Sequence, residues 1–165
     1  MSEKSVADRP ALTPEQWAAF LSRTEIFSLR FTSVHCDVLG DPTELAPGEP
    51  APETPERLPP EVRLVDAGKI KQIHAFVPLR VKLRTPGKAA REVLDLSVTA
   101  QVVYTLRHEP DAGPIDPYLE AFKGQAAFHA WPFLREMLHE MFLRTGHGVA
   151  LLPLLHPRAP KRGAK

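Results

Sequence analysis

Apolar and polar residues alternate over two long stretches in the middle of the chain. The apolar members are Ile73, Ala75, Val77, Leu79, Val81 and Leu83 in the first stretch, and Leu94, Leu96, Val98, Ala100, Val102, Tyr104 and Leu106 in the second. A period of two residues is typical of a β-strand with one buried face. Residues 85–88 (Thr-Pro-Gly-Lys) supply the backbone angles of a turn between them. The pattern predicts a long antiparallel hairpin, with Pro78 at a sheet edge or a bulge because proline donates no ladder hydrogen bond.

A further strand is predicted over residues 26–39, where the alternation changes phase. Phe27, Leu29 and Phe31 occupy one parity, and Val34, Cys36 and Val38 occupy the other. Neighbouring residues of a strand point to opposite faces. The change of phase therefore predicts a β-bulge or a passage from one environment to another.

Two helices flank these strands. Thr13 and Gln16 have the spacing of a capping box, with Pro14 at the first helical position, so a short helix is predicted over residues 13–23. A long helix is predicted over residues 118–144, with Gly146 as its C-cap. Its apolar stripe comprises Ala127, Trp131, Leu134, Leu138, Met141 and Phe142. Pro132 predicts a kink or a fresh helix start at that point.

The remaining segments differ in composition from these elements. Residues 41–61 hold seven of the 18 prolines and are predicted to form a long extended loop. Residues 1–12 are predicted to be a disordered leader, and the basic residues 158–165 a disordered, solubilising tail. The 165 residues predict a single α+β domain over residues 13–157.

The net charge bears on the kind of partner, and the cysteine content bears on the cellular location. The net charge of +1 creates no global attraction to nucleic acid or to an anionic membrane, so neither is predicted as a partner. No apolar run suits a signal peptide or a membrane span. A single cysteine, Cys36, forms no internal disulfide, which predicts a reducing, cytoplasmic location.

The chain shows no strong catalytic or cofactor motif. The seven histidines lack the spacing of a metal site, and no glycine-rich loop is placed to cradle a phosphate, so no metal and no cofactor is predicted. His35 and Cys36 are neighbours in a predicted strand, so the imidazole cannot activate the thiol. A binding role is favoured over catalysis. An enzyme using His129, Glu136 or His139 stays as an alternative class.

One segment resembles a known family. Residues 127–136 (AFHAWPFLRE), followed by Arg144-Thr145-Gly146 and the Leu/Pro-rich residues 151–155, resemble the C-terminal signature of SecB and the SecB-like chaperones. The order of a strand, a long polar loop, a long hairpin and a helix is also that of the family. The short helix before the first strand is similar to the toxin–antitoxin-associated branch.

The resemblance implies a four-stranded antiparallel sheet with a long helix packed on one face, and a fourth strand over residues 61–68. It also implies homo-oligomers built as a dimer of dimers, with unfolded or nascent polypeptides as clients and an antitoxin or a translocase as a further partner. SecB continues after the Leu/Pro run into a second helix and is strongly acidic. The present chain does neither, which favours a specialised chaperone or adaptor over export.

These observations lead to two sets of candidate residues. Apolar side chains that the pairing of helix and hairpin does not use are assigned to peptide binding: Val34, Val38, Phe76 and Val103. The helical stripe is assigned to an oligomer interface: Trp131, Leu134, Leu138 and Met141. The predicted function is an ATP-independent, export-type holdase for non-native polypeptide. The alternative is an adaptor or structural subunit of the same fold with one dedicated protein partner.

Overall fold

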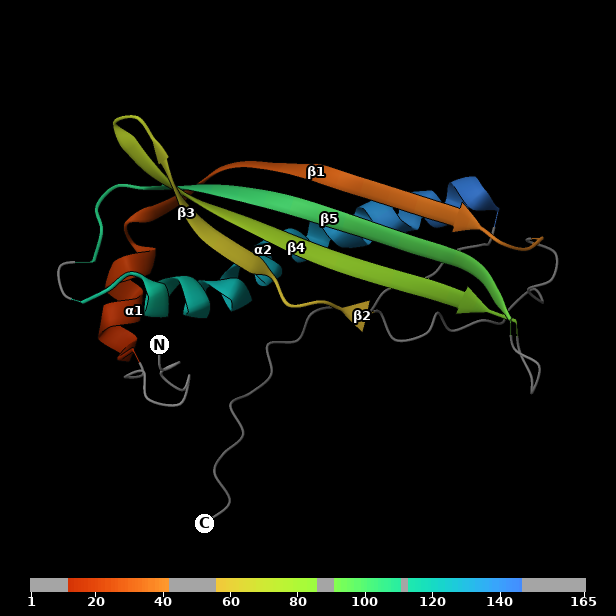
Figure 1. The fold of residues 1–165 in the computed structure, drawn as a ribbon, viewed down its shortest axis with the longest axis horizontal. Helices are drawn as coiled ribbons and strands as arrows, with labels where there is room; N and C mark the ends of the chain where they lie inside the picture. Colours follow the sequence, from red (N-terminus) through yellow and green to blue (C-terminus); the bar gives the residue numbers. More distant parts are fainter. Residues whose placement is uncertain (1–11, 42–55, 86–90, 111–112, 147–165) are drawn as a thin grey trace, which may run out of the picture.

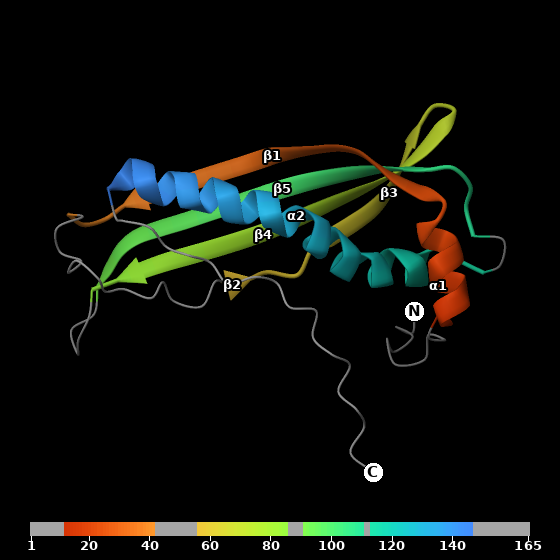
Figure 2. The same ribbon diagram turned by 180° about the vertical axis from the view of Figure 1, so that it is seen from behind.

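The computed structural model describes residues 12–41, 56–85, 91–110 and 113–146. They form an antiparallel sheet with one long helix lying obliquely across one face and a short helix at one end (Figures 1 and 2). The other face of the sheet carries no helix among the described residues (Figure 1). The structure thus confirms the predicted α+β class with a long helix on one side.

The predicted hairpin forms the centre of the sheet. Strands β4 (Ile70–Arg84) and β5 (Glu92–Leu106) pair along their whole length, from Lys71 opposite Leu106 to Arg84 opposite Glu92. Residues 86–88 of the turn predicted at residues 85–88 lie outside the described residues, but Thr85 N–H donates to the carbonyl of Arg91 and closes the end of the hairpin. Strand β1 (Thr24–Val38) pairs with β5 and forms one edge of the sheet.

The opposite edge is shared by two short strands that both pair with β4. Strand β3 (Glu61–Ala67) is the fourth strand that the sequence predicts, and it turns into β4 through Gly68 at a φ of 74°. Strand β2 (Glu56–Arg57) is an additional strand inside the segment predicted to be a loop. Pro78 lies opposite the gap between β2 and β3, at a sheet edge as predicted.

The core lies between the sheet and helix α2 (Asp116–Thr145). The alternating residues of the hairpin face α2, whose buried side chains follow a four-residue spacing: Tyr118, Phe122, Ala126, Ala130, Leu134, Leu138 and Phe142. The helix is continuous through Pro132, so of the two outcomes predicted there, a kink or a fresh helix start, the fresh start does not occur. Proline removes the hydrogen bond to the carbonyl of Phe128. Both residues are exposed, so water can satisfy that carbonyl instead.

Helix α1 (Pro14–Leu21) closes the end of the core near the start of α2. The capping box is confirmed: Gln16 N–H donates to Thr13 Oγ1, and Thr13 N–H donates to Gln16 Oε1 at 2.9 Å. Phe20 is buried, and its ring lies 4.9 Å from that of Tyr118. The predictions for residues 1–11, 42–55 and 147–165, including the Leu/Pro-rich segment and the basic tail, lie outside the described residues.

Candidate functional site

Six of the seven apolar residues of β1 lie on the face of the sheet that carries α2, and the seventh, Phe27, is 67% exposed. Register shifts leave Phe27 and Thr32 without a partner on β5, so these two residues form bulges. Each bulge turns the following residues over once. The apolar residues at odd and at even positions of the sequence therefore lie on the same face of the sheet, opposite helix-facing residues of β5. We call this row the β1 strip: Ile26, Leu29, Phe31, Val34, Cys36 and Val38.

Half of the β1 strip is exposed. Helix α2 packs against β5, β4 and β3 and leaves much of β1 uncovered. Ile26 is 53% exposed, Val34 44% and Val38 54%, whereas Leu29, Phe31 and Cys36 are partly buried against the core. Exposed apolar side chains in a row along one strand are typical of a contact surface for another protein segment.

The backbone beside this strip is available for pairing. Strand β1 is 15 residues long and bonds only to β5 among the described strands, so its outer edge presents main-chain donors and acceptors. Long edge strands without a partner readily accept another strand. The β1 strip thus combines an open hydrogen-bonding edge with apolar side chains on one face, which is what an extended apolar segment requires.

Phe76 and Val103, two of the predicted peptide-binding residues, lie on the opposite face of the sheet. Val103 is 6% exposed, and the Arg63 guanidinium lies 4.7 Å from the ring centre of half-buried Phe76. They share no surface with Val34 and Val38, so the four residues do not form a single groove. The alternation of the hairpin already predicts this face for Phe76 and Val103, whereas the face of Val34 and Val38 depends on the two bulges of β1.

A polar network covers this open face. Arg30 Nε donates to Gln101 Oε1 at 2.7 Å, Gln101 Nε2 lies 3.2 Å from His74 Nδ1, and His74 Nε2 lies 3.0 Å from Gln72 Oε1. Gln101 is 3% exposed. Burial lowers the pKa of His74, and the nearby charges of Arg63 and Arg30 lower it further. The network therefore requires a neutral imidazole and makes this face a poor place for apolar clients.

Three of the residues assigned to an oligomer interface lie inside the core of the chain. Trp131 is 5% exposed, Leu134 1% and Leu138 0%, because α2 turns them toward the sheet. Met141 is partly buried against the same core. This corrects the sequence assignment of Trp131, Leu134 and Leu138. The exposed apolar residues of α2 are instead Phe128, Phe133 and Leu143.

Of the residues considered for catalysis, His129 and His35 have structural partners. His129 Nδ1 lies 3.0 Å from Tyr104 Oη, and His129 Nε2 lies 2.9 Å from Gln125 Nε2. Burial lowers the pKa of His129. His35 contacts Asp37 at 2.8 Å. Cys36 belongs to the β1 strip, and burial raises the pKa of its thiol. Among the described residues, no group of three or more His, Cys, Asp or Glu side chains is placed to hold a metal ion.

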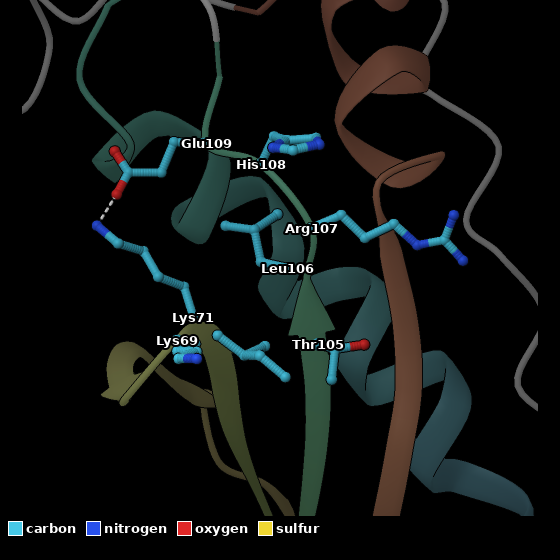
Figure 3. A pocket seen from close by; sticks show the side chains of 8 residues that line it. Lys69, Lys71, Thr105, Leu106, Arg107, His108 and Glu109 are labelled. Atoms are coloured by element: carbon cyan, nitrogen blue, oxygen red, sulfur yellow. Dashed lines mark hydrogen bonds and ion pairs between the residues drawn. The ribbon is translucent and has the colours of Figure 1, made fainter.

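An open depression of about 640 Å³ lies elsewhere, where the β3–β4 turn meets the end of β5 (Figure 3). Lys71 forms an ion pair with Glu109 there, and Arg107 points away from that pair (Figure 3) and pairs with Glu25. These charges are exposed and satisfy one another. Lys71, Glu109 and Arg107 are thus used in ion pairs, and we assign no binding or catalytic role to the depression. No helix in the described part of the chain is long and apolar enough to span a membrane.

Comparisons with known proteins bear on the fold. No protein-family model and no curated protein matches the sequence. Among solved structures, the SecB-like chaperone Rv1957 of Mycobacterium tuberculosis, in complex with a ChAD peptide from the Rv1956 HigA1 antitoxin, superposes with a TM-score of 0.62. The alignment has 16% identity and covers 86% of this chain and 97% of the chaperone.

A protein of unknown function from Streptococcus agalactiae is more distant, with a TM-score of 0.47, 12% identity, and coverage of 80% of this chain and 97% of that protein. The similarity to the chaperone agrees in sheet, helix and element order with what the sequence predicts. We conclude that this chain has the SecB-like fold.

Proposed function

We propose that this protein is an ATP-independent holdase that binds extended, apolar segments of non-native polypeptide along the β1 strip. The observation that carries the proposal is the coincidence of exposed Ile26, Val34 and Val38 with the outer edge of a 15-residue strand, to which no second described strand pairs. Main-chain pairing at such an edge tolerates many sequences, and the apolar row selects unfolded segments over folded surfaces. The SecB-like fold supports this function, since a chaperone of that fold binds a peptide.

In this proposal the protein works as a homo-oligomer, which is a dimer of dimers. Phe128, Phe133 and Leu143 are the side chains of α2 that are free to contact another copy. Together with the β1 strip, these side chains expose apolar surface of the kind that marks contacts with other proteins. Contacts through α2 would leave both edges of the sheet accessible to clients.

The test is suppression of client aggregation, measured by light scattering with a slow-folding client. The double variant Val34→Lys, Val38→Lys places two charges in the β1 strip. It should weaken client binding about tenfold or more, because burying each valine contributes about 1 kcal/mol. The control is Ile70→Lys, which changes an exposed residue outside the strip (51% exposed, against 54% for Val38). If the wild-type protein does not suppress aggregation at stoichiometric levels, the holdase proposal fails.

A second candidate function is an adaptor with one dedicated partner, which the same surface can serve. It is favoured by the chaperone of similar fold, which is solved with a peptide from a single antitoxin. Affinity capture from the native cell extract separates the two functions. One dominant protein would favour the adaptor, and a broad range of unfolded clients would favour the holdase.

A further inference from the structure

The sheet edge opposite the β1 strip is only partly occupied. Strand β2 pairs with β4 through two residues, Glu56 opposite Arg80 and Arg57 opposite Leu79. Pro59 and Pro60 separate β2 from β3. On the side of β4 that faces away from β5, no described strand pairs with residues 81–84. A two-residue ladder contributes few hydrogen bonds, so β2 is a weakly held occupant of this edge.

A cation–π contact helps to hold β2 in place. Arg57 lies on the helix side of the sheet, because its partner Leu79 faces α2, and its guanidinium sits 4.7 Å from the ring centre of Trp131. Trp131 is 5% exposed, whereas both residues of β2 are exposed. A single cation–π contact is a modest interaction beside the main-chain hydrogen bonds that a longer strand would form with β4. A competing strand that offers its own group to Trp131 can therefore replace it.

The charges beside this edge define what a competing strand should carry. Arg80, Lys82 and Arg84 occupy alternate positions of β4 on the open face. They share the carboxylates of Asp95 and Glu92: Arg80 Nε donates to Asp95 at 2.8 Å, and Lys82 and Arg84 contact Glu92 at 2.8 and 3.0 Å. Glu56 adds a carboxylate opposite the first of these cations.

A strand aligned like β2 would continue this arrangement along β4. It would run antiparallel to β4, and its alternate residues would face Arg80, Lys82 and Arg84 on the open side. The residues between them would face the helix side, beside Leu79, Val81 and Leu83. Charge complementarity thus favours carboxylates at every second position, and the apolar surroundings favour apolar residues between them.

We propose that the edge Leu79–Arg84 is a second peptide-binding site, which takes an extended segment of alternating acidic and apolar residues from a protein partner. Glu56 and Arg57 occupy this site in cis, and such a segment displaces them. The site lies across the sheet from the β1 strip, so both edges can be filled together. It depends on none of the residues that carry the holdase proposal.

The test uses a fluorescein-labelled peptide, Glu-Val-Glu-Val-Glu-Arg, whose residues would face Arg84 through Leu79 in that order. Fluorescence anisotropy should show saturable binding to the full-length protein that weakens as salt is added. The peptide Lys-Val-Lys-Val-Lys-Arg has the same length and apolar residues but opposite charge, and it should not bind. Equal binding of the two peptides would overturn the proposal.

A variant and a matched control test whether Glu56 and Arg57 of the same chain compete with the peptide for this edge. Arg57→Ala removes the stacking on Trp131 and should tighten binding of the acidic peptide about two- to fivefold. Arg63→Ala removes a guanidinium at the same 4.7 Å distance from an aromatic ring, that of Phe76 on the other face, and should leave the affinity unchanged. Unchanged or weaker binding to the Arg57 variant would show that β2 does not compete for the site.

Two further outcomes separate this site from other uses of the edge. The Val34→Lys, Val38→Lys variant should bind the acidic peptide as the wild type does, even if it no longer suppresses client aggregation. Loss of peptide binding in that variant would merge the two sites and refute a second one. A fall in the light-scattering mass when peptide is added would assign the edge to a second copy of the chain and also refute the proposal.

Discussion

At the scale of single residues, two histidines connect the stability of the fold to pH. His74 sits in the polar network of the open face, with Arg30 on β1 and Arg63 on β3 as its charged neighbours. His129 joins α2 to β5 through Tyr104. Both imidazoles have a pKa below the ordinary value, His74 through burial and the two arginines, His129 through burial. Both are therefore neutral in the folded protein near neutral pH.

These histidines predict a loss of stability in mild acid. A pKa lowered by folding means that the unfolded chain takes up protons first as pH falls below about 6.5. The stabilising contribution is thus complete above that pH and is lost progressively until the depressed folded-state value is reached. Thermal unfolding followed by circular dichroism should show a lower Tm at about pH 5.5 than at about pH 7.5. The double variant His74→Gln, His129→Gln should show a smaller difference, and an equal difference would contradict this account.

At the scale of elements, α2 presents two kinds of aromatic side chain within three residues. Trp131 is 5% exposed and packs in the core beneath Arg57, whereas Phe133 is 47% exposed. Trp131→Ala should lower the free energy of unfolding by about 3–5 kcal/mol through loss of packing. Under conditions in which the protein is monomeric, Phe133→Ala should change it by less than about 0.5 kcal/mol. Chemical denaturation checks both, and equal effects would show that α2 does not lie on the sheet as described.

Local sequence signals predicted most of the elements but not how they present their side chains. The hairpin, the capping box at Thr13 and the C-cap at Gly146 follow from spacing alone, because each depends on residues close in sequence. The face on which Val34 lies depends on two bulges, and a change of parity does not state where the extra residue sits. Strand β2 was missed because a two-residue strand among prolines has no periodic signal.

The assignment of the apolar stripe of α2 to an oligomer interface also shows that local sequence patterns do not define the packing partner of a helix. Its spacing correctly predicted one apolar side of α2 but did not say what covers that side. The hairpin covers it within the same chain, so the residues available to a partner are those outside the stripe. Exposure of Phe128 and Phe133 arises from the position of α2 over β5, β4 and β3, which only the tertiary structure defines.

At the scale of the whole molecule, the proposed dimer of dimers predicts a defined mass. Multi-angle light scattering of the purified protein should give four copies of the 18.4 kDa chain. The triple variant Phe128→Lys, Phe133→Lys, Leu143→Lys should reduce that mass, because three charges would enter the proposed contact. A wild-type protein that is monomeric at all concentrations would contradict the proposed assembly.

The proposed holdase function requires that an extended client pair with the outer edge of β1. Hydrogen exchange followed by mass spectrometry, with and without a bound unfolded client, tests it most directly. The client should slow amide exchange in residues 24–38, and the Val34→Lys, Val38→Lys variant should lose this protection. Client binding that leaves exchange in β1 unchanged would contradict it.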